Sequence, residues 1–255
     1  MAEPLLRVEA LRKQFGGIVA SDDITLEVAR GELHAIIGPN GAGKTTLINQ
    51  LAGEIASDAG RIVFDGHDIT ALRPDRRSML GLARSFQITS LLSDFTALDN
   101  VALAAQAHDG HSFYFWSSAR QEKHLREAAR SALARVGLEH RAEVVVSKLS
   151  HGEQRELELA VALATKPRLL LLDEPMAGLG ITESARMVKL LQELRRELTI
   201  VLVEHDMDAV FALADRITVL VYGRVIASGL PSDIRQNEEV KRAYLGDQHV
   251  VVRHG

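Results

Sequence analysis

The chain has 255 residues, of which 46% are hydrophobic and 25% are charged, a composition typical of folded globular proteins and unlike that of disordered or fibrous chains. Its 30 Lys and Arg stand against 34 Asp and Glu, a formal net charge of -4, and no basic block indicates a nucleic-acid partner. The absence of cysteine excludes disulfides and thiolate metal sites.

The sequence gives no sign of a leader or a membrane span. Residues 1–9 lack the basic start and the apolar run of a signal peptide. The longest apolar runs, such as 169–172 and 199–203, are far shorter than the roughly 18 residues that cross a bilayer. We therefore expect the chain to stay in the cytoplasm and any membrane role to require a partner.

Short β-branched or alternating segments open the chain. Residues 5–11, 24–28 and 33–37 are predicted strands because glycines divide them. Residues 61–69, with Asp65-Gly66 at their centre, predict a further hairpin. These segments predict that the N-terminal part of the chain consists mainly of strands.

The middle of the chain has helical spacing. Thr96 and Asp99 resemble a capping box before a helix over 101–107. A second helix, ended by Gly137, has one apolar face formed by Leu125, Ala128, Ala129, Ala132, Leu133 and Val136. We expect a single domain over 1–255, with a core of about 1–88 and 165–255 and a helical subdomain of about 89–164.

The last third alternates strands with helices. Residues 168–172 and 199–203 are continuous apolar runs on either side of helical spacing over 183–198, which predicts buried parallel strands in a doubly wound sheet. Residues 217–228 predict a closing hairpin, and a short helix begins at Ser232. The expected fold class is α/β.

A glycine-rich segment between a predicted strand and a predicted helix matches G-x-x-x-x-G-K-[ST]. Its glycines allow backbone N–H groups to turn towards phosphate oxygens, and the helix start adds positive potential. Lys44 would reach the outer phosphates and the Thr45 hydroxyl would hold Mg²⁺. The residues predicted to bind a nucleotide here are Gly38, Pro39, Asn40, Gly41, Ala42, Gly43, Lys44, Thr45 and Thr46.

Two acids follow the apolar strand 169–172, at the sheet edge where open α/β proteins bind ligands. Asp173 is placed to hold Mg²⁺ through water. Glu174 is placed to polarise an attacking water as a general base, since a carboxylate in a dry site has a raised proton affinity. The alternative is that both acids only cap the next segment.

The segment Leu149-Ser150-His151-Gly152-Glu153-Gln154 resembles the L-S-G-G-Q signature of the ATP-binding cassette family. Together with the phosphate loop and the acid pair, the resemblance covers about residues 5–246. It implies a P-loop NTPase core with a mixed, largely parallel sheet, an N-terminal antiparallel β subdomain and an inserted helical subdomain. It also implies that ATP is hydrolysed to ADP and phosphate with Mg²⁺ as cofactor.

The same resemblance implies a dimer in which each signature contacts the ATP held by the partner's phosphate loop. Ser150, His151, Gly152 and Glu153 are the positions expected to contact ATP in trans, although His151 replaces the family's first glycine and Glu153 extends the motif. Ser150 is also a plain helix N-cap. Gly180 stands where the family has an Asp, which would favour a heterodimer over a homodimer.

Three further positions match the family by spacing. Phe15 resembles the aromatic residue that stacks on adenine, and Gln87 the glutamine that senses Mg²⁺ and the membrane partner. His205 resembles the switch histidine, which would hydrogen-bond the γ-phosphate and orient Glu174. The resemblance thus implies Glu174, His205, Gln87 and Lys44 as the catalytic residues, and Thr45, Gln87 and Asp173 as the residues at Mg²⁺.

Details of sequence favour the ATPases of bacterial branched-chain amino acid importers. These details are Phe15-Gly16-Gly17, Gly152-Glu153-Gln154-Arg155, Glu204-His205-Asp206-Met207 and Ala243-Tyr244-Leu245-Gly246. The resemblance implies transmembrane permease subunits, a second ABC ATPase subunit and a periplasmic solute-binding protein as partners, without nucleic acid. It places the chain on the cytoplasmic face of the inner (plasma) membrane.

Several alternatives stay open. Importers of urea, amides or aromatic acids use similar ATPases, because the solute is selected by other subunits. A soluble cassette ATPase acting on DNA or ribosomes would need a coiled-coil insertion between Gln87 and Leu149 or a second cassette, and a kinase would not need the signature at a helix start. The aromatic segment 113–116 would dock a membrane subunit or the membrane surface, or fold back on its own lobe.

Overall fold

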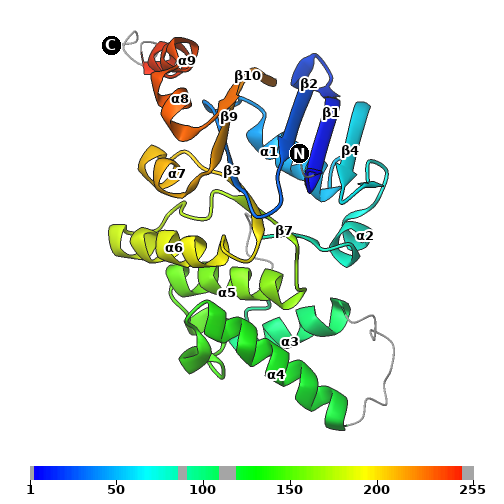
Figure 1. The fold of residues 1–255 in the computed structure, drawn as a ribbon. Coiled ribbons are helices and arrows are strands. Elements are labelled where there is room, and N and C mark those ends of the chain that lie inside the picture. Colours follow the sequence, from blue (N-terminus) through cyan, green and yellow to red (C-terminus); the bar gives the residue numbers. More distant parts are fainter. Residues whose placement is uncertain (1–2, 86–90, 109–118, 249–255) are drawn as a thin grey trace.

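A computed structural model describes residues 3–85, 91–108 and 119–248 and shows two sheets (Figure 1). The antiparallel sheet has the order β2-β1-β4-β5, formed by β1 (Leu6–Phe15), β2 (Ile18–Val28), β4 (Ala59–Phe64) and β5 (His67–Asp68). The second sheet has the order β10-β9-β3-β8-β7-β6, formed by β3 (Leu33–Ile37), β6 (Leu82–Arg84), β7 (Leu169–Asp173), β8 (Thr199–Val203), β9 (Arg216–Val221) and β10 (Arg224–Gly229). Its strands are parallel from β9 to β6, and β10 is antiparallel. The predicted α/β class, with its largely parallel sheet and antiparallel β subdomain, is confirmed.

Helices surround the parallel sheet. The described helices are α1 (Lys44–Ala52), α2 (Pro74–Met79), α3 (Ala97–His108), α4 (Ala119–Arg135), α5 (His151–Ala164), α6 (Ile181–Leu194), α7 (Met207–Leu213), α8 (Pro231–Gln236) and α9 (Glu238–Gln248). Helices α3, α4 and α5 pack on one another and form a lobe at the end of the molecule away from the antiparallel sheet (Figure 1). Within the described ranges, no helix is both long and apolar enough to cross a membrane. The domain boundaries at about 88 and 164 stay a prediction.

The apolar strands set the layers because alternate side chains of a strand point to opposite faces. In β7, Leu170 and Leu172 pack into the cluster shared with the helical lobe and α6. Leu169 and Leu171 pack into the cluster shared with α1 and the antiparallel sheet. All five residues of β7 are buried, so the strand carries Asp173 to the sheet edge from between two apolar layers.

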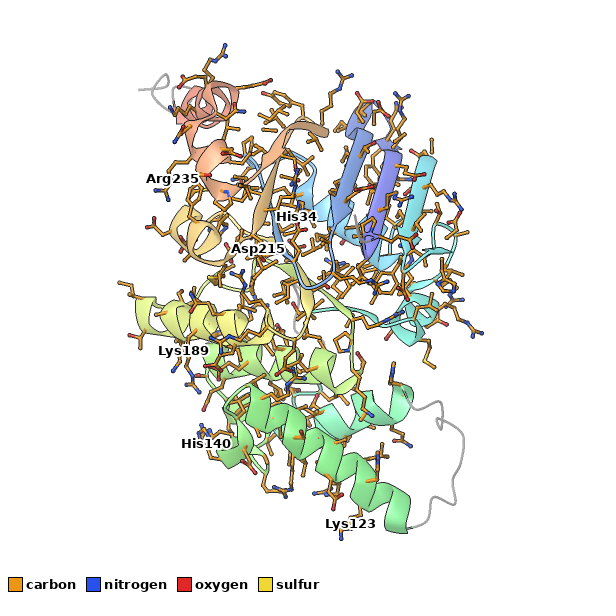
Figure 2. The ribbon with its side chains drawn as sticks, in the orientation of Figure 1. His34, Lys123, His140, Lys189, Asp215 and Arg235 are labelled. Carbon is orange, nitrogen blue, oxygen red and sulfur yellow. The ribbon has the colours of Figure 1, made fainter. Side chains whose placement is uncertain are left out.

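Surface side chains of the lobe and of α6 contrast with this apolar interior. Lys123, His140 and Lys189 point away from the body of the molecule (Figure 2), and all three are exposed. His34 by contrast lies within β3 and is fully buried. A polar residue buried inside the sheet, such as His34, needs a hydrogen-bond partner there.

Some predicted boundaries are wrong. Strands β1 and β2 are longer than the predicted 5–11 and 24–28, because register shifts near Leu11 and Lys13 interrupt the alternation. The first lobe helix begins at Ala97, since the Thr96 hydroxyl accepts from the Asp99 N–H at 3.1 Å. The predicted capping box is only half formed, because the Asp99 carboxylate accepts from the Thr96 hydroxyl at 2.6 Å. Helix α9 was not predicted at all.

Candidate functional site

The phosphate loop occupies residues 38–43, between the end of β3 and the start of α1. A Cβ at Gly38 would lie 2.1 Å from the Leu220 carbonyl oxygen, and one at Gly43 would lie 2.2 Å from the Ala20 carbonyl oxygen. Gly43 also has a φ of 100°, a conformation that side chains disfavour. Glycine is therefore required at both ends of the loop, where β2 and β9 press against it.

Lys44 begins α1 and is 7% exposed. Its Nζ donates to the carbonyl oxygens of Gly38 at 2.7 Å and Pro39 at 3.1 Å. Burial lowers the pKa of this ammonium, and the charges of Glu174 and Asp173 oppose that shift. The ammonium thus lies over the loop it would serve, with Thr45 and Thr46 half-buried in the first turn of α1 behind it.

Asp173 ends β7 and is 2% exposed. Its Oδ2 accepts from Arg84 Nη2 at 3.3 Å, while its Oδ1 is buried and has no hydrogen-bond partner among the described residues. Burial raises the pKa of this carboxyl, Arg84 opposes the rise and Glu174 adds to it. Leaving a buried oxygen without a hydrogen-bond partner costs on the order of 1–3 kcal/mol. A ligand bound at Oδ1 would remove this cost.

Glu174 and His205 come together because β7 and β8 are neighbours in the sheet. Glu174 Oε1 lies 4.0 Å from His205 Nδ1. Glu174 has a φ of 49°, which is strained for a residue with a Cβ, and its N–H donates to the Val203 carbonyl at 2.9 Å. The structure thus places the predicted base and the predicted switch histidine side by side, at the edge that also carries Asp173.

The signature forms the start of α5 in the helical lobe. Ser150 caps the helix by accepting from the Glu153 N–H at 3.2 Å, and Glu153 Oε2 accepts from the Ser150 N–H at 2.8 Å. Arg141 also binds the Glu153 carboxylate, with Nε–Oε1 at 2.7 Å. His151 is exposed and Gly152 is buried. A Cβ on Gly152 would lie 2.6 Å from Glu183 Oε1, so the signature touches the start of α6.

The other predicted positions differ in what the structure says of them. Phe15 ends β1, is 46% exposed, and has Lys13 Nζ 5.3 Å from its ring centroid. Gly180 caps α6 with a φ of -72°, and a Cβ there would meet only Glu183 Oε2, at an ordinary contact distance of 3.8 Å, so nothing local requires glycine there. Gln87 and the aromatic segment 113–116 lie outside the described residues.

Two residues at this edge were not predicted as part of the site. Arg84 donates to Asp173, and its Nη1 also lies 2.6 Å from Asn49 Oδ1 and 2.6 Å from Glu54 Oε2. Glu204 is fully buried directly after β8. The sequence signal for both residues is a charge within or directly after an apolar strand, where the side chain is buried away from water.

Comparisons with known proteins agree with this geometry. The family model described as "ABC transporter" matches residues 21–177, and the one described as "Branched-chain amino acid ATP-binding cassette transporter" matches residues 224–250. The chain is similar to the high-affinity branched-chain amino acid transport ATP-binding protein BraF of Pseudomonas aeruginosa, with 38% identity over 254 residues that cover 97% of this chain and 100% of BraF.

Solved structures show the same fold. The chain is similar to an ATP-binding cassette of an ABC transporter in its ADP conformation, with a TM-score of 0.84 and 28% identity over 96% of this chain and 100% of that one. It is also similar to a dimeric cassette in a post-hydrolysis state bound to ADP and Pi, with a TM-score of 0.76 and 26% identity over 89% and 98% of the two chains. The chain belongs to the ABC transporter family and is one of its ATPases.

Proposed function

We propose that the chain is the ATP-hydrolysing subunit of an importer of branched-chain or closely related amino acids. The observation that carries the hydrolytic part is the pairing of Glu174 and His205, 4.0 Å apart, at the sheet edge that holds Asp173. The similarity to BraF and the match of residues 224–250 support the solute class.

In the proposed mechanism, the N–H groups of the phosphate loop and the start of α1 hold the phosphates of ATP. Lys44 Nζ exchanges the carbonyls of Gly38 and Pro39 for oxygens of the outer phosphates. Glu174 accepts a proton from the water that attacks the γ-phosphorus, and the bond to the bridging oxygen of ADP breaks. His205 donates to the γ-phosphate and holds Glu174 in place, while Phe15 stacks on the adenine.

The donor set fits Mg²⁺ as cofactor. Asp173 Oδ1 is a buried carboxylate oxygen without a partner among the described residues, and hard cations prefer oxygen ligands. Asp173, the Thr45 hydroxyl and the Gln87 amide would hold the ion. When bound, Mg²⁺ neutralises charge that develops on the phosphates. A fall in ATP hydrolysis on chelation, restored by added Mg²⁺, would support this assignment.

We propose that the site is completed by a second ABC ATPase subunit. The dimeric relative bound to ADP and Pi supports this arrangement. Ser150, His151, Gly152 and Glu153 would contact the partner's ATP; the Glu153 carboxylate already binds Ser150 and Arg141, and the Glu153 N–H already donates to Ser150 Oγ. Ser150→Arg should spare ATP binding by the monomer and abolish hydrolysis, and equal loss of both would contradict action in trans.

A surface on the helical lobe is the proposed binding site for the membrane permease. Leu92, Phe95 and Leu103 are 46%, 48% and 43% exposed. Leu92 and Leu103 line a cavity of about 330 Å³ that also contains Glu158, whose Oε1 is buried without a hydrogen-bond partner in the described part of the chain. An apolar surface with a polar atom left to satisfy suits a protein segment, and family membership makes the permease that occupant.

Native co-purification from detergent-solubilised membranes tests the proposal. Two multi-span proteins, a second cassette ATPase and a periplasmic binding protein identified by mass spectrometry would support an importer at the cytoplasmic face of the membrane. Recovery only from the soluble fraction with ribosomal or DNA-bound partners would overturn it. Leu103→Asp should lose the membrane proteins, whereas Met79→Asp, which changes an apolar residue that is 53% exposed on α2, should retain them.

A further inference from the structure

Glu204 is a buried carboxylate whose hydrogen bonds, within the described part of the chain, come from two turns at the candidate site. Its Oε1 accepts from the Met176 N–H at 3.0 Å, and its Oε2 accepts from the N–H groups of His205 at 2.9 Å and Asp206 at 3.3 Å. The residue is 0% exposed. Met176 lies in the turn that follows β7, and His205 and Asp206 form the turn that follows β8.

We infer that Glu204 is a positioning residue that sets the distance between Glu174 and His205 by fastening their two turns together. The inference rests on the proposed roles of these two side chains. Pairing of β7 with β8 ends at Asp173 and Val203, so the sheet itself does not fix what lies beyond. Beyond that point the turns are joined by the Glu174 N–H to Val203 O hydrogen bond of 2.9 Å and by Glu204.

The strain at Glu174 explains why such a connection is needed. A φ of 49° at a residue with a Cβ persists only where the surroundings hold the backbone in that conformation. The Met176 N–H and the Glu174 carbonyl, which accepts from the Ala177 N–H at 3.0 Å, fix the turn on its far side. Without Glu204, the turn would be free to relax towards an unstrained conformation and carry the Glu174 carboxylate away from His205.

Glu204 also limits the position of the His205 ring. Its Oε2 lies 3.6 Å from His205 Nδ1, compared with 4.0 Å for Glu174 Oε1. The His205 side chain is itself 63% exposed, so packing against neighbouring residues does little to fix its position. Both carboxylates lie on the Nδ1 side of the ring. Nε2 is therefore the nitrogen that a phosphate would meet.

Glu204→Gln tests the inference because it keeps the size of the side chain and replaces one acceptor oxygen with a donor. We expect ATP hydrolysis with Mg²⁺, measured on the chain assembled with its permease and second ATPase subunits, to lose at least about tenfold in kcat, with KM for ATP changed by less than about twofold. In a His205→Ala background, Glu204→Gln should cost less than about twofold further, because residues that act through one another are not additive. Unchanged kcat, or an equal loss in both backgrounds, would overturn the inference.

Glu32→Gln is the matched control. Glu32 also accepts a backbone N–H, that of Ala29 at 2.9 Å, but it lies before β3 at the other end of the strands. This variant should leave kcat unchanged. Amide hydrogen exchange of Met176 and His205 should accelerate in Glu204→Gln and not in Glu32→Gln. If the wild-type chain assembled with its permease and second ATPase subunits fails to hydrolyse ATP, the proposed function is wrong, whereas unaltered amide exchange in Glu204→Gln would separately refute the fastening of the two turns.

Discussion

The two edges of the parallel sheet differ in how they treat buried charge. At the C-terminal edge, burial shifts the pKa of Lys44 downward and that of Asp173 upward, so both groups move towards their neutral forms. At the N-terminal edge, burial would raise the pKa of Glu32, but hydrogen bonds from His34 and the Ala29 N–H outweigh it and lower the pKa. The first edge therefore holds two charges that burial disfavours despite their hydrogen bonds, and the second holds a carboxylate whose hydrogen bonds outweigh the effect of burial.

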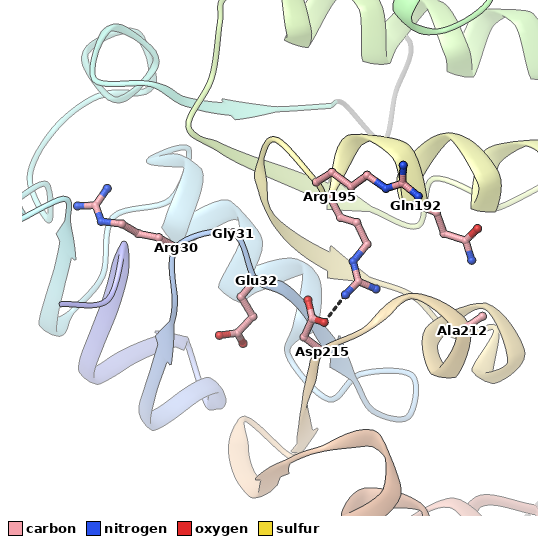
Figure 3. A pocket seen from close by; sticks show the side chains of 8 residues that line it. Arg30, Gly31, Glu32, Gln192, Arg195, Ala212 and Asp215 are labelled. Atoms are coloured by element: carbon pink, nitrogen blue, oxygen red, sulfur yellow. Dashed lines mark hydrogen bonds and ion pairs between the residues drawn. The ribbon is translucent and has the colours of Figure 1, made fainter. Parts of the chain in front are cut away.

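The N-terminal edge is closed by short local networks. His34 Nδ1 lies 2.7 Å from Glu32 Oε1 and its Nε2 lies 2.8 Å from Thr218 Oγ1. Asp215 accepts from the Leu33 N–H at 2.9 Å and pairs with Arg195 beside a cavity of about 550 Å³ (Figure 3). Backbone strain is stored at functional sites, and at the edge with the phosphate loop the left-handed Glu174 directly follows Asp173, whose Oδ1 has no partner among the described residues.

The largest effect is expected at Glu174. Glu174→Gln removes the general base but keeps the size of the side chain, so ATP hydrolysis should fall by about 10² to 10⁴-fold, while ATP still binds and holds the dimer closed. Phosphate release in steady state and the oligomeric state with ATP measure the two parts. Normal turnover in Glu174→Gln would exclude its role as base.

Matched substitutions at the two edges should differ in their effect on the free energy of unfolding. Asp173→Asn removes a charge that burial disfavours and should not lower the free energy of unfolding, although it abolishes hydrolysis. Asp215→Asn weakens the pair with Arg195 and the acceptor of the Leu33 N–H, and should cost about 1 kcal/mol with hydrolysis unchanged. Urea unfolding in the presence of EDTA measures both, and an equal loss in the two variants would refute the contrast.

The strain at Glu174 gives a smaller prediction. Glu174→Gly and Glu174→Ala both remove the carboxylate, but only glycine adopts a φ of 49° without steric cost. We expect the free energy of unfolding of the glycine variant to exceed that of the alanine variant by about 1 kcal/mol. If the alanine variant is as stable as the glycine variant, the left-handed conformation is not a source of strain.

The smallest effect concerns pH. Because the folded pKa of Glu32 lies below the ordinary value of 4.5 for a glutamate, its contribution to stability is present above that value and is lost as pH falls through the lowered pKa. The wild type should therefore lose stability relative to Glu32→Gln between about pH 5 and pH 3. Parallel stability curves for the two proteins over this range would show that Glu32 is not held in its charged form.

Much of the fold could be predicted because its signals are local. The predicted bounds of β3, α1 and β8 agree with the structure at both ends; these elements are a short strand in which only His34 is not apolar, a helix between two glycines and an apolar run after Thr199. The antiparallel strands were predicted too short because a bulge is set by pairing with another strand, which a single sequence does not contain. Helix α9 has acids in its first turn and few apolar residues, so its periodicity is weak.

The site shows the same division. The phosphate loop and the Asp173-Glu174 pair are sequence motifs, and their positions followed once strand and helix were predicted. Arg84 could not be linked to Asp173 from the sequence, since 89 residues separate the two and only the pairing of β6 with β7 brings them together. Glu204 was visible as a charged residue directly after an apolar strand and as part of a family pattern, but its partners are backbone N–H groups that no sequence motif reveals.

The insertion of the helical lobe between β6 and β7 has a consequence for folding. These strands pair directly, yet residues 85–168 separate them, so their contact closes a long segment of chain. Local helix contacts form faster than such distant pairings, and a lobe that folds first shortens the segment to be closed. We therefore expect Asp173 to meet Arg84 late. A nascent chain on the ribosome carries the residues of the phosphate loop long before it carries Asp173, and it cannot hydrolyse ATP before Glu174 and His205 have been synthesised.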